Sequence, residues 1–156
     1  MTVKLRNCQE SDLPFLVELF RRTVWTINAK DYTQEQLEIW APDSIDPKSE
    51  WWLSLLRTTC FVAFINREIV GFANLTKVGL VDFFFVHHRH IGEGIGKMLY
   101  QALEKEARQM GMQKLTAEAS LTALPFFEKQ GFQKIKKQSK QKQHVVLTNF
   151  LMGKDL

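Results

Sequence analysis

The stretch from Val81 to Tyr100 constrains the fold of this chain more than any other segment. It reads VDFFFV, HHRHI, GEGIG and KMLY in succession. An apolar run, a polar bend, three alternate glycines and a helical pattern predict a strand, an anion-binding loop and a helix whose N-terminus faces that loop. Glycines let backbone N–H groups crowd around a ligand, and the positive end of the helix dipole favours negative charge. The segment therefore predicts a ligand that carries phosphate.

Two common nucleotide-binding motifs do not fit this loop. A P-loop requires a glycine five residues before Gly96 and a hydroxyl residue after Lys97, but Ile91 and Met98 stand there. A dinucleotide fingerprint requires a small residue three positions after Gly94, and that position is Lys97. The glycines alone leave a purely structural turn as the alternative.

A second segment gives the loop a context. From Glu118 to Phe132 the chain reads EASLTALPFFEKQGF. Together the two segments resemble the GNAT superfamily of acetyl-CoA-dependent N-acyltransferases. In that family a Gln/Arg-x-x-Gly-x-Gly/Ala loop holds the pyrophosphate of coenzyme A, and an Asn-x-x-Ala-x-x-Phe-Tyr-x-x-x-Gly-Phe segment follows. The two patterns fall here on residues 91–96 and 120–132, and the resemblance implies an N-acetyltransferase that uses acetyl-CoA.

The remaining periodicity agrees with the element order of that family. Helices are predicted from Asp12, from Thr33 with a Gln36 capping box, and from Asp46, the last with Trp51, Trp52, Leu55 and Leu56 facing inward. Further helices are predicted over 95–110 and 122–130, and strands over 2–6, 60–65, 69–75, 80–86, 114–119, 132–138 and 144–152. The predicted fold is α/β, with a mixed, mainly antiparallel sheet flanked by helices in one domain spanning residues 1–156.

Composition limits the setting in which the protein works. With 156 residues and 45% hydrophobic content the chain fits one domain with a real core. Charges interrupt the first thirty residues and no apolar run approaches ~18 residues, so a soluble, cytoplasmic protein with no membrane partner is predicted. Cys8 and Cys60 are far apart in sequence and outside any metal-ligand or redox spacing, so both are interpreted as small core residues in a reducing compartment.

The net charge of +4 is unevenly distributed. Six lysines fall between residues 129 and 142, a stretch with no acidic residue. A solvated hairpin explains them, and attraction of polyanionic coenzyme A or of an acidic partner is the alternative. Nucleic acid is disfavoured because no aromatic residues interleave with the lysines for base stacking. The expected partner is a small-molecule or peptide amine, and a homodimer is left open.

The resemblance assigns most of the cofactor site to backbone groups. It implies that Phe84, Phe85 and Val86 hydrogen-bond the pantetheine arm, and that the N–H of Phe84 or its neighbour polarises the acetyl carbonyl. The other positions that it places at coenzyme A are Ile91, Gly92, Glu93, Gly94, Ile95, Gly96, Lys97, Ser120 and Phe127.

A lone carboxylate in the apolar strand is the first candidate for the general base. Strict alternation places Asp82 on the face of Phe84 and Val86, and apolar surroundings should raise its pKa, which makes it a better proton acceptor near neutral pH. A strand-edge Asp that binds a neighbouring backbone or Arg group is the alternative. Glu118, on the next strand, is the second candidate.

The chain departs from the family pattern at four positions. Phe127 occupies the place where many members carry a Tyr that protonates the thiolate, and Ser120 replaces the frequent Asn. In the loop, Ile91 replaces Gln/Arg and Glu93 replaces a commonly basic residue. The nearby run HHRH at 87–90 offers compensating positive charge or another base, or is simply solvated. These departures leave a catalytically weak acyl-CoA-binding or regulatory module as the alternative function.

Aromatic residues near the N-terminus are candidates for the amine-binding wall. Trp25 lies off the main apolar face of its helix and Tyr32 falls in a predicted loop, so both are predicted to contact substrate. Trp40, Trp51 and Trp52 follow helical spacing and are interpreted as core. Neither cysteine shows a sign of activation, which favours direct attack of the amine in a ternary complex, and no metal site is predicted.

Overall fold

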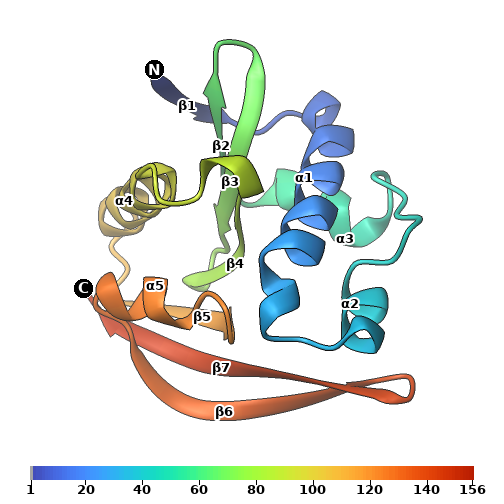
Figure 1. Ribbon diagram of the computed structural model, residues 1–156. Helices are drawn as coiled ribbons and strands as arrows, with labels where there is room; N and C mark the ends of the chain where they lie inside the picture. The colour runs from blue at the N-terminus through green and yellow to red at the C-terminus, as the bar shows by residue number, and fades with distance from the viewer. Residues whose placement is uncertain (1) are drawn as a thin grey trace.

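A computed structural model describes residues 2–156 and contains one seven-stranded sheet (Figure 1). The strands are β1 Val3–Asn7, β2 Thr59–Ile65, β3 Glu68–Leu75, β4 Leu80–Val86, β5 Lys114–Ser120, β6 Gln133–Lys142 and β7 Val145–Asp155. They lie in the order β1-β2-β3-β4-β5-β7-β6, and every neighbouring pair is antiparallel except β4 and β5. The predicted mixed, mainly antiparallel sheet is confirmed.

Helices cover both faces of the sheet and create two cores. They are α1 Leu13–Thr26, α2 Gln34–Trp40, α3 Glu50–Leu53, α4 Ile95–Gln109 and α5 Leu124–Lys129, with short 3-10 turns η1 Glu10–Asp12, η2 Asn28–Lys30, η3 Ser54–Arg57 and η4 His88–His90. On one face, Leu99 and Leu103 of α4 pack with Val70. On the other, Phe20 of α1 packs with Phe72. Figure 1 shows α4 on one side of β2–β4 and α1–α3 on the other. Among the residues described, no helix is long and apolar enough to cross a membrane.

The two predicted helix starts near the N-terminus have different outcomes. The capping box is confirmed, since Thr33 Oγ1 accepts from the Gln36 N–H at 3.2 Å and Gln36 Oε1 accepts from the Thr33 N–H at 2.9 Å. Asp12 does precede α1, but its backbone is already helical and its carboxylate turns back. It accepts from the Gln9 N–H at 2.8 Å and pairs with Arg6 at 2.7 Å. Asp12 therefore caps the preceding 3-10 turn rather than α1.

The tryptophan-rich helix begins later than the sequence predicts, at Glu50, and its orientation also differs. Trp52 and Leu55 are fully buried as predicted, whereas Trp51 is 49% exposed and Leu56 is 37% exposed. The reason is that α3 passes at residue 54 into a 3-10 helix, in which residues three apart share a face. That spacing places Trp52 and Leu55 on the buried face and leaves Trp51 and Leu56 partly exposed to solvent.

Strand β4 is irregular on both of its edges, with a bulge toward β3 and a divergence from β5. Toward β3, Ala73 faces Phe84 and Leu75 faces Val81, so one Asn74 stands opposite two β4 residues. The result is a β-bulge, and the Asn74 side chain accepts the Phe83 N–H at 2.6 Å. Toward β5, pairing stops after Leu80↔Thr116 and Val81↔Ala117. Beyond Val81 the two strands diverge and leave what we call the β4–β5 opening.

Candidate functional site

The β4 edge presents free backbone donors to the β4–β5 opening. The His87 N–H donates to the Val70 carbonyl oxygen of β3 at 2.8 Å, and the Phe83 N–H is bound to a β3 side chain. Because N–H directions alternate along a strand, those of Phe84 and Val86 point away from β3, into the opening. Two hydrogen-bond donors are thus available to an extended ligand lying beside β4.

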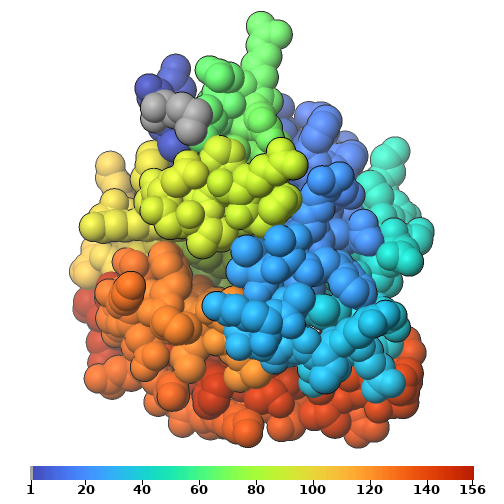
Figure 2. All heavy atoms as spheres, viewed as in Figure 1, coloured from blue at the N-terminus to red at the C-terminus, as the bar shows by residue number. Residues whose placement is uncertain are grey.

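The glycine loop ends the opening on one side. Gly92 and Gly94 have φ of +82° and +86°, and an added Cβ would meet nothing within 4 Å at either. They are thus required by backbone conformation, not by lack of space. Gly96 differs, because a Cβ there would come within 3.1 Å of the Phe126 ring. Figure 2 shows this loop (yellow-green) on the same face as the end of α1 (blue) and the segment around α5 (orange).

The start of α4 offers an anion site of the predicted kind. Gly94 occupies the N-cap, and the Met98 N–H donates to the Gly94 carbonyl oxygen at 3.1 Å as the first bond of the helix. The N–H groups of Ile95, Gly96 and Lys97 precede that bond, so they have no partner within the helix. Together with the positive end of the helix dipole they favour phosphate oxygens.

The acidic side chain of the loop lies against a histidine of the preceding bend. His90 Nδ1 lies 3.0 Å from Glu93 Oε1, which ties the unusual loop carboxylate to the preceding bend. In the same bend His87 Nδ1 accepts from the Arg89 N–H at 3.1 Å. Burial, together with the neighbouring His88 and His90, lowers the pKa of His87. A neutral His87 held by a backbone contact supplies no positive charge to the loop.

The two candidate bases lie close enough to influence each other, but only one is free. Among residues 2–156, Asp82 has no hydrogen bond or ion pair through its side chain, whereas Glu118 is ion-paired with Lys140. Asp82 is exposed by surface area, yet desolvation by the walls of the opening is the main cause of its raised pKa. The Glu118 charge raises the pKa further and Lys140 acts against it. The predicted direction of the Asp82 shift is confirmed.

The position of Asp82 differs from the one that strict alternation predicts. Val81 and Phe84 both pack into the core on the α4 side of the sheet, which we call the α4-side core. In a regular strand, residues three apart would point to opposite faces. The bulge inserts the extra residue between them and reverses the pattern. Phe83 faces the α1-side core, and Asp82 interacts with Glu118 there rather than sharing the face of Phe84 and Val86. The alternation prediction was wrong because it assumed a regular strand.

Ser120 and Phe127 stand at the far side of the opening. Ser120 Oγ accepts from the Ala123 N–H at 3.1 Å and from Asn28 Nδ2 at 3.3 Å, so its own hydroxyl proton is left for a ligand. Phe127 is 3% exposed, and its ring centroid lies 5.6 Å from that of Phe84. It is an apolar packing residue that cannot donate a proton.

The predicted amine-binding aromatics turn out to be anchored. Tyr32 is buried, and its hydroxyl donates to the Thr148 carbonyl oxygen at 2.8 Å and accepts from the Leu121 N–H at 2.9 Å. Trp25 is half-buried, and its indole N–H donates to the Ala41 carbonyl oxygen at 2.7 Å. Burial removes Tyr32 from the accessible wall that the sequence predicted, because its hydroxyl joins the helical layer to β7 and to the residue that follows β5.

Trp51 is the accessible aromatic that sequence reasoning missed. Its ring centroid lies 4.8 Å from Phe83 and 6.2 Å from Phe20, and about half of the side chain faces solvent. Phe83 follows Asp82 in the bulge, so the exposed indole packs on the residue next to the free carboxylate in the chain. The signal in the sequence was the three-residue spacing of Trp52 and Leu55, which excludes Trp51 from the buried face.

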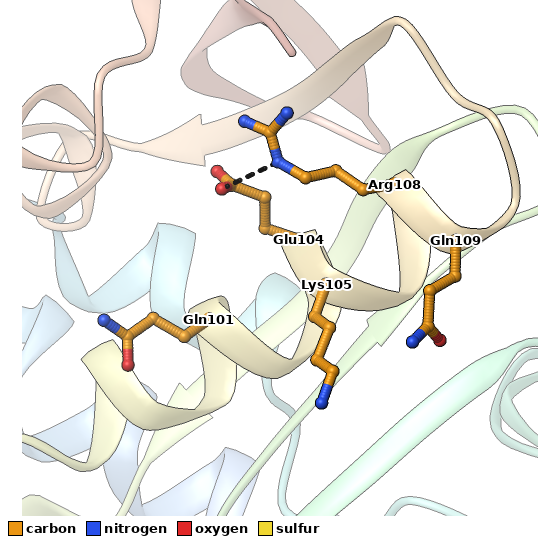
Figure 3. A pocket seen from close by; sticks show the side chains of 5 residues that line it. All are labelled: Gln101, Glu104, Lys105, Arg108 and Gln109. Carbon is orange, nitrogen blue, oxygen red and sulfur yellow. Dashed lines mark hydrogen bonds and ion pairs between the residues drawn. The ribbon is translucent and has the colours of Figure 1, made fainter.

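A second depression, of about 490 Å³, lies on the outer face of α4, away from the opening (Figure 3). Its walls come from this one helix, and Figure 3 shows Glu104 paired there with Arg108 at 3.3 Å. Glu104 also accepts from the Tyr100 hydroxyl and from Lys154 Nζ, both at 2.6 Å. Burial opposes its ionisation, but these partners lower the pKa to about 2. The cluster fastens α4 to the end of β7.

Glu104→Gln should lower the free energy of unfolding by about 1 to 3 kcal/mol at pH 7, because charged hydrogen bonds are lost. Since the folded pKa lies below the ordinary value of 4.5, the stabilisation is present above about pH 4.5 and is lost as pH falls toward 2. Urea unfolding at several pH values measures this, with exposed Glu128→Gln as control. A difference that does not shrink at low pH would contradict it.

The sequence and the fold agree with those of known proteins. The family model described as an acetyltransferase (GNAT) domain matches residues 28–154. The chain belongs to the GNAT acetyltransferase family. A relative from Escherichia coli (strain K12), described as the uncharacterized N-acetyltransferase YafP, is 33% identical over 150 residues, covering 96% of this chain and 94% of the relative. The family resemblance drawn from the two motifs is thereby confirmed.

Solved structures of GNAT proteins share this architecture. A GCN5-related N-acetyltransferase from Rhodopseudomonas palustris is 30% identical, with a TM-score of 0.93 over 100% of this chain and 97% of that one. The PaiA N-acetyltransferase of Thermoplasma acidophilum, solved in complex with coenzyme A, has a TM-score of 0.80 at 20% identity over all of both chains. YncA of Salmonella typhimurium, a putative acetyltransferase solved with acetyl-CoA, has a TM-score of 0.75 at 20% identity, over 100% and 95% of the two chains.

Proposed function

We propose that this GNAT protein transfers the acetyl group of acetyl-CoA to the primary amine of a small molecule or peptide, by direct attack in a ternary complex. The observation that carries the proposal is the β4–β5 opening, where unpaired N–H groups of Phe84 and Val86 lie between the α4 anion site and a free carboxylate. The coenzyme A and acetyl-CoA found with structural neighbours support the choice of donor. We expect the enzyme to act in the cytoplasm, and a homodimer stays open.

Backbone groups would hold the cofactor, so the side-chain departures in the loop are compatible with binding. The N–H groups of Ile95, Gly96 and Lys97 would bind the pyrophosphate, and the β4 edge would bind the pantetheine arm. Residues 91–94 would shape the approach, and the Ser120 hydroxyl would donate to the cofactor. The acetyl thioester supplies an activated carbonyl carbon. The Phe84 N–H would stabilise negative charge on its oxygen, and a buried backbone donor of this kind typically contributes ~10²-fold or more.

Proton removal from the amine is assigned to Asp82. The attacking nitrogen must lose a proton as the carbon–nitrogen bond forms, and a carboxylate with a raised pKa accepts it more readily than an ordinary one. Glu118 is held by Lys140 and is the second candidate. The Phe127 side chain has no proton to donate to the departing thiolate of coenzyme A. The thiolate would therefore take its proton from water.

The acceptor is expected to meet Trp51 on its way to Asp82. Because the indole packs on Phe83, the residue after Asp82, and is half exposed, it offers apolar surface that an acceptor could contact. Trp51→Ala should raise KM about 10-fold for amines with an apolar body and leave acetyl-CoA affinity unchanged. Steady-state kinetics test this, with Phe15→Ala, another exposed aromatic, as control. Equal effects of the two variants would remove Trp51 from the acceptor wall.

The loop charge gives a separate prediction. Replacing Glu93 with Lys removes an unfavourable charge near the pyrophosphate site and adds a favourable one, so coenzyme A should bind about 3- to 10-fold more tightly at low salt, with the gain shrinking as salt rises. Calorimetric titration at two ionic strengths measures this, with Glu38→Lys on α2 as control. An unchanged Kd would show that the carboxylate held by His90 does not sense the cofactor.

A catalytically weak acyl-CoA-binding or regulatory module is the second candidate, favoured by the buried Phe127. The deciding experiment is thiol release from acetyl-CoA over a panel of alkylamines, arylalkylamines, polyamines and peptide N-termini. Amine-dependent release with an acetylated product supports the transferase. Tight acetyl-CoA binding without release above the uncatalysed rate, over the whole panel, would favour the binding module.

A further inference from the structure

The two cysteines of the chain, Cys8 and Cys60, lie face to face despite their distance in sequence. The β1–β2 register ends with Asn7 opposite Phe61, so the next opposed pair is Cys8 and Cys60. The Cys8 N–H donates to the Cys60 carbonyl oxygen at 2.9 Å. Directly opposed residues of an antiparallel pair have Cα atoms about 4.5 to 5.5 Å apart. That separation lies within the range of about 4.4 to 6.8 Å that a disulfide spans.

The two side chains also point into the same core. Cys60 belongs to the α1-side core, and Cys8 packs against that core. The Cys8 thiol donates to the Gln9 carbonyl oxygen at 3.6 Å. Interaction with Cys60 lowers the pKa of Cys8 despite burial, with help from Arg6 and against the charge of Asp12. Cys8 is also the more exposed of the two thiols, so it is the more readily ionised sulfur and the one that a reagent meets first.

A small reagent can reach this pair. Cys60 is 5% exposed, but Cys8 is only half-buried, and both border a surface cavity of about 360 Å³ together with Leu55 and Thr58. The space a water molecule takes in the liquid is about 30 Å³, so a molecule with two oxygen atoms fits readily. Neither thiol takes part in the chemistry proposed for the β4–β5 opening.

We propose that Cys8 and Cys60 are a peroxide-responsive site that closes a reversible intramolecular disulfide. The Cys8 thiolate attacks one peroxide oxygen, so a sulfur–oxygen bond forms, the oxygen–oxygen bond breaks and hydroxide leaves. The Cys60 sulfur then attacks Cys8 and loses its proton, the sulfur–oxygen bond breaks and water leaves. Two thiols are oxidised and one peroxide is reduced, giving one disulfide and two waters. An external thiol reverses the step by exchange.

The disulfide would join the two ends of the segment that forms the helical layer on one face of the sheet. Residues 9–59, between the two cysteines, contain α1, α2 and α3, which cover the sheet face that carries Asp82 and which include Trp51. Closing a loop of this length restricts the unfolded chain, so the thermal midpoint should rise by about 5 to 10 °C on oxidation. The clamp would hold the acceptor-side layer against β1 and β2.

Hydrogen peroxide in small excess over the full-length protein tests the proposal. The intact mass should fall by the mass of two hydrogen atoms, both thiols should become unreactive after denaturation, and dithiothreitol should restore them and the original midpoint. Because the chain has only two cysteines, any intramolecular disulfide must join Cys8 to Cys60. Mass gains from sulfinic acid without the loss of two hydrogens, or a disulfide between two chains, would overturn the proposal.

Variants that each lack one cysteine separate the role of the attacking thiol from that of the resolving thiol. Cys60→Ser should leave a Cys8 that gains one or two oxygen atoms, because the resolving thiol is missing. Cys8→Ser should leave Cys60 unmodified at the same peroxide dose, because the remaining thiol is 5% exposed and burial alone still raises its pKa. Equal oxidation of both variants would contradict the assignment of Cys8 as the attacking sulfur.

Discussion

Asp82→Asn should lower kcat by about 10²- to 10⁴-fold while acetyl-CoA affinity stays nearly unchanged. The substitution keeps the size and hydrogen-bonding capacity of the side chain but removes its ability to take a proton. Because the folded pKa of Asp82 is raised, the wild-type rate should fall on the acid side through a pKa above the ordinary aspartate value. In the Asn variant that limb should vanish or move toward the pKa of the amine.

Two further variants give this prediction its control and its competitor. Asp43→Asn removes a carboxylate whose side chain is 99% exposed, so it should leave kcat unchanged. Glu118→Gln frees Lys140, whose charge should then lower the pKa of Asp82, so its effect should be smaller and appear as a shifted pH profile. If Glu118→Gln loses activity and Asp82→Asn keeps it, the base belongs on β5. If both keep it, the amine loses its proton to water and the enzyme works by positioning.

The elements of the sheet could be predicted because their signals are local. Apolar runs bounded by turn residues gave the hairpin of β2 and β3, and the alternate glycines gave the loop before α4. The bulge in β4 was missed because it depends on a partner strand. A signal did exist, since Asn74 is an amide within an apolar strand and is 1% exposed. A buried side chain of that kind needs a backbone partner, and an extra N–H in the neighbouring strand supplies one.

The site was only partly predictable for the same reason. Backbone assignments at Phe84 and in the glycine loop depend on the end of β4 and the start of α4, and the apolar run and the alternate glycines locate both. The exposure of Tyr32 and Trp51 was the reverse of the one expected, because it depends on distant elements. Tyr32 is buried where its hydroxyl bonds β7 and the residue that follows β5, and Trp51 is left outside by the 3-10 turn of η3. The facing of Cys8 and Cys60 likewise follows from β1–β2 register, which no local spacing encodes.

Gly94→Val should abolish the stabilisation that acetyl-CoA gives to the fold. At ~100 times its Kd the ligand should add about 2.7 kcal/mol to the free energy of unfolding of the wild type, or roughly 5 to 10 °C in midpoint. Gly94 has φ of +86°, a conformation that a β-branched residue strongly disfavours, so the variant must rebuild the N-cap of α4. The N–H groups that precede the first helical bond would then no longer converge on the pyrophosphate.

Gly111→Val is the matched control, because Gly111 has φ of +77° at the other end of the same helix, and an added Cβ there would also meet nothing within 4 Å. Both variants should lower the midpoint without ligand, since the strain of a non-glycine residue at positive φ costs about 1 to 3 kcal/mol. Only Gly94→Val should lose the acetyl-CoA shift in differential scanning fluorimetry. A shift lost in both variants would point to general loosening of α4. A shift kept by Gly94→Val would mean that the pyrophosphate is not bound at the α4 N-terminus, and an absent shift in the wild type would remove the basis for acetyl-CoA as the donor.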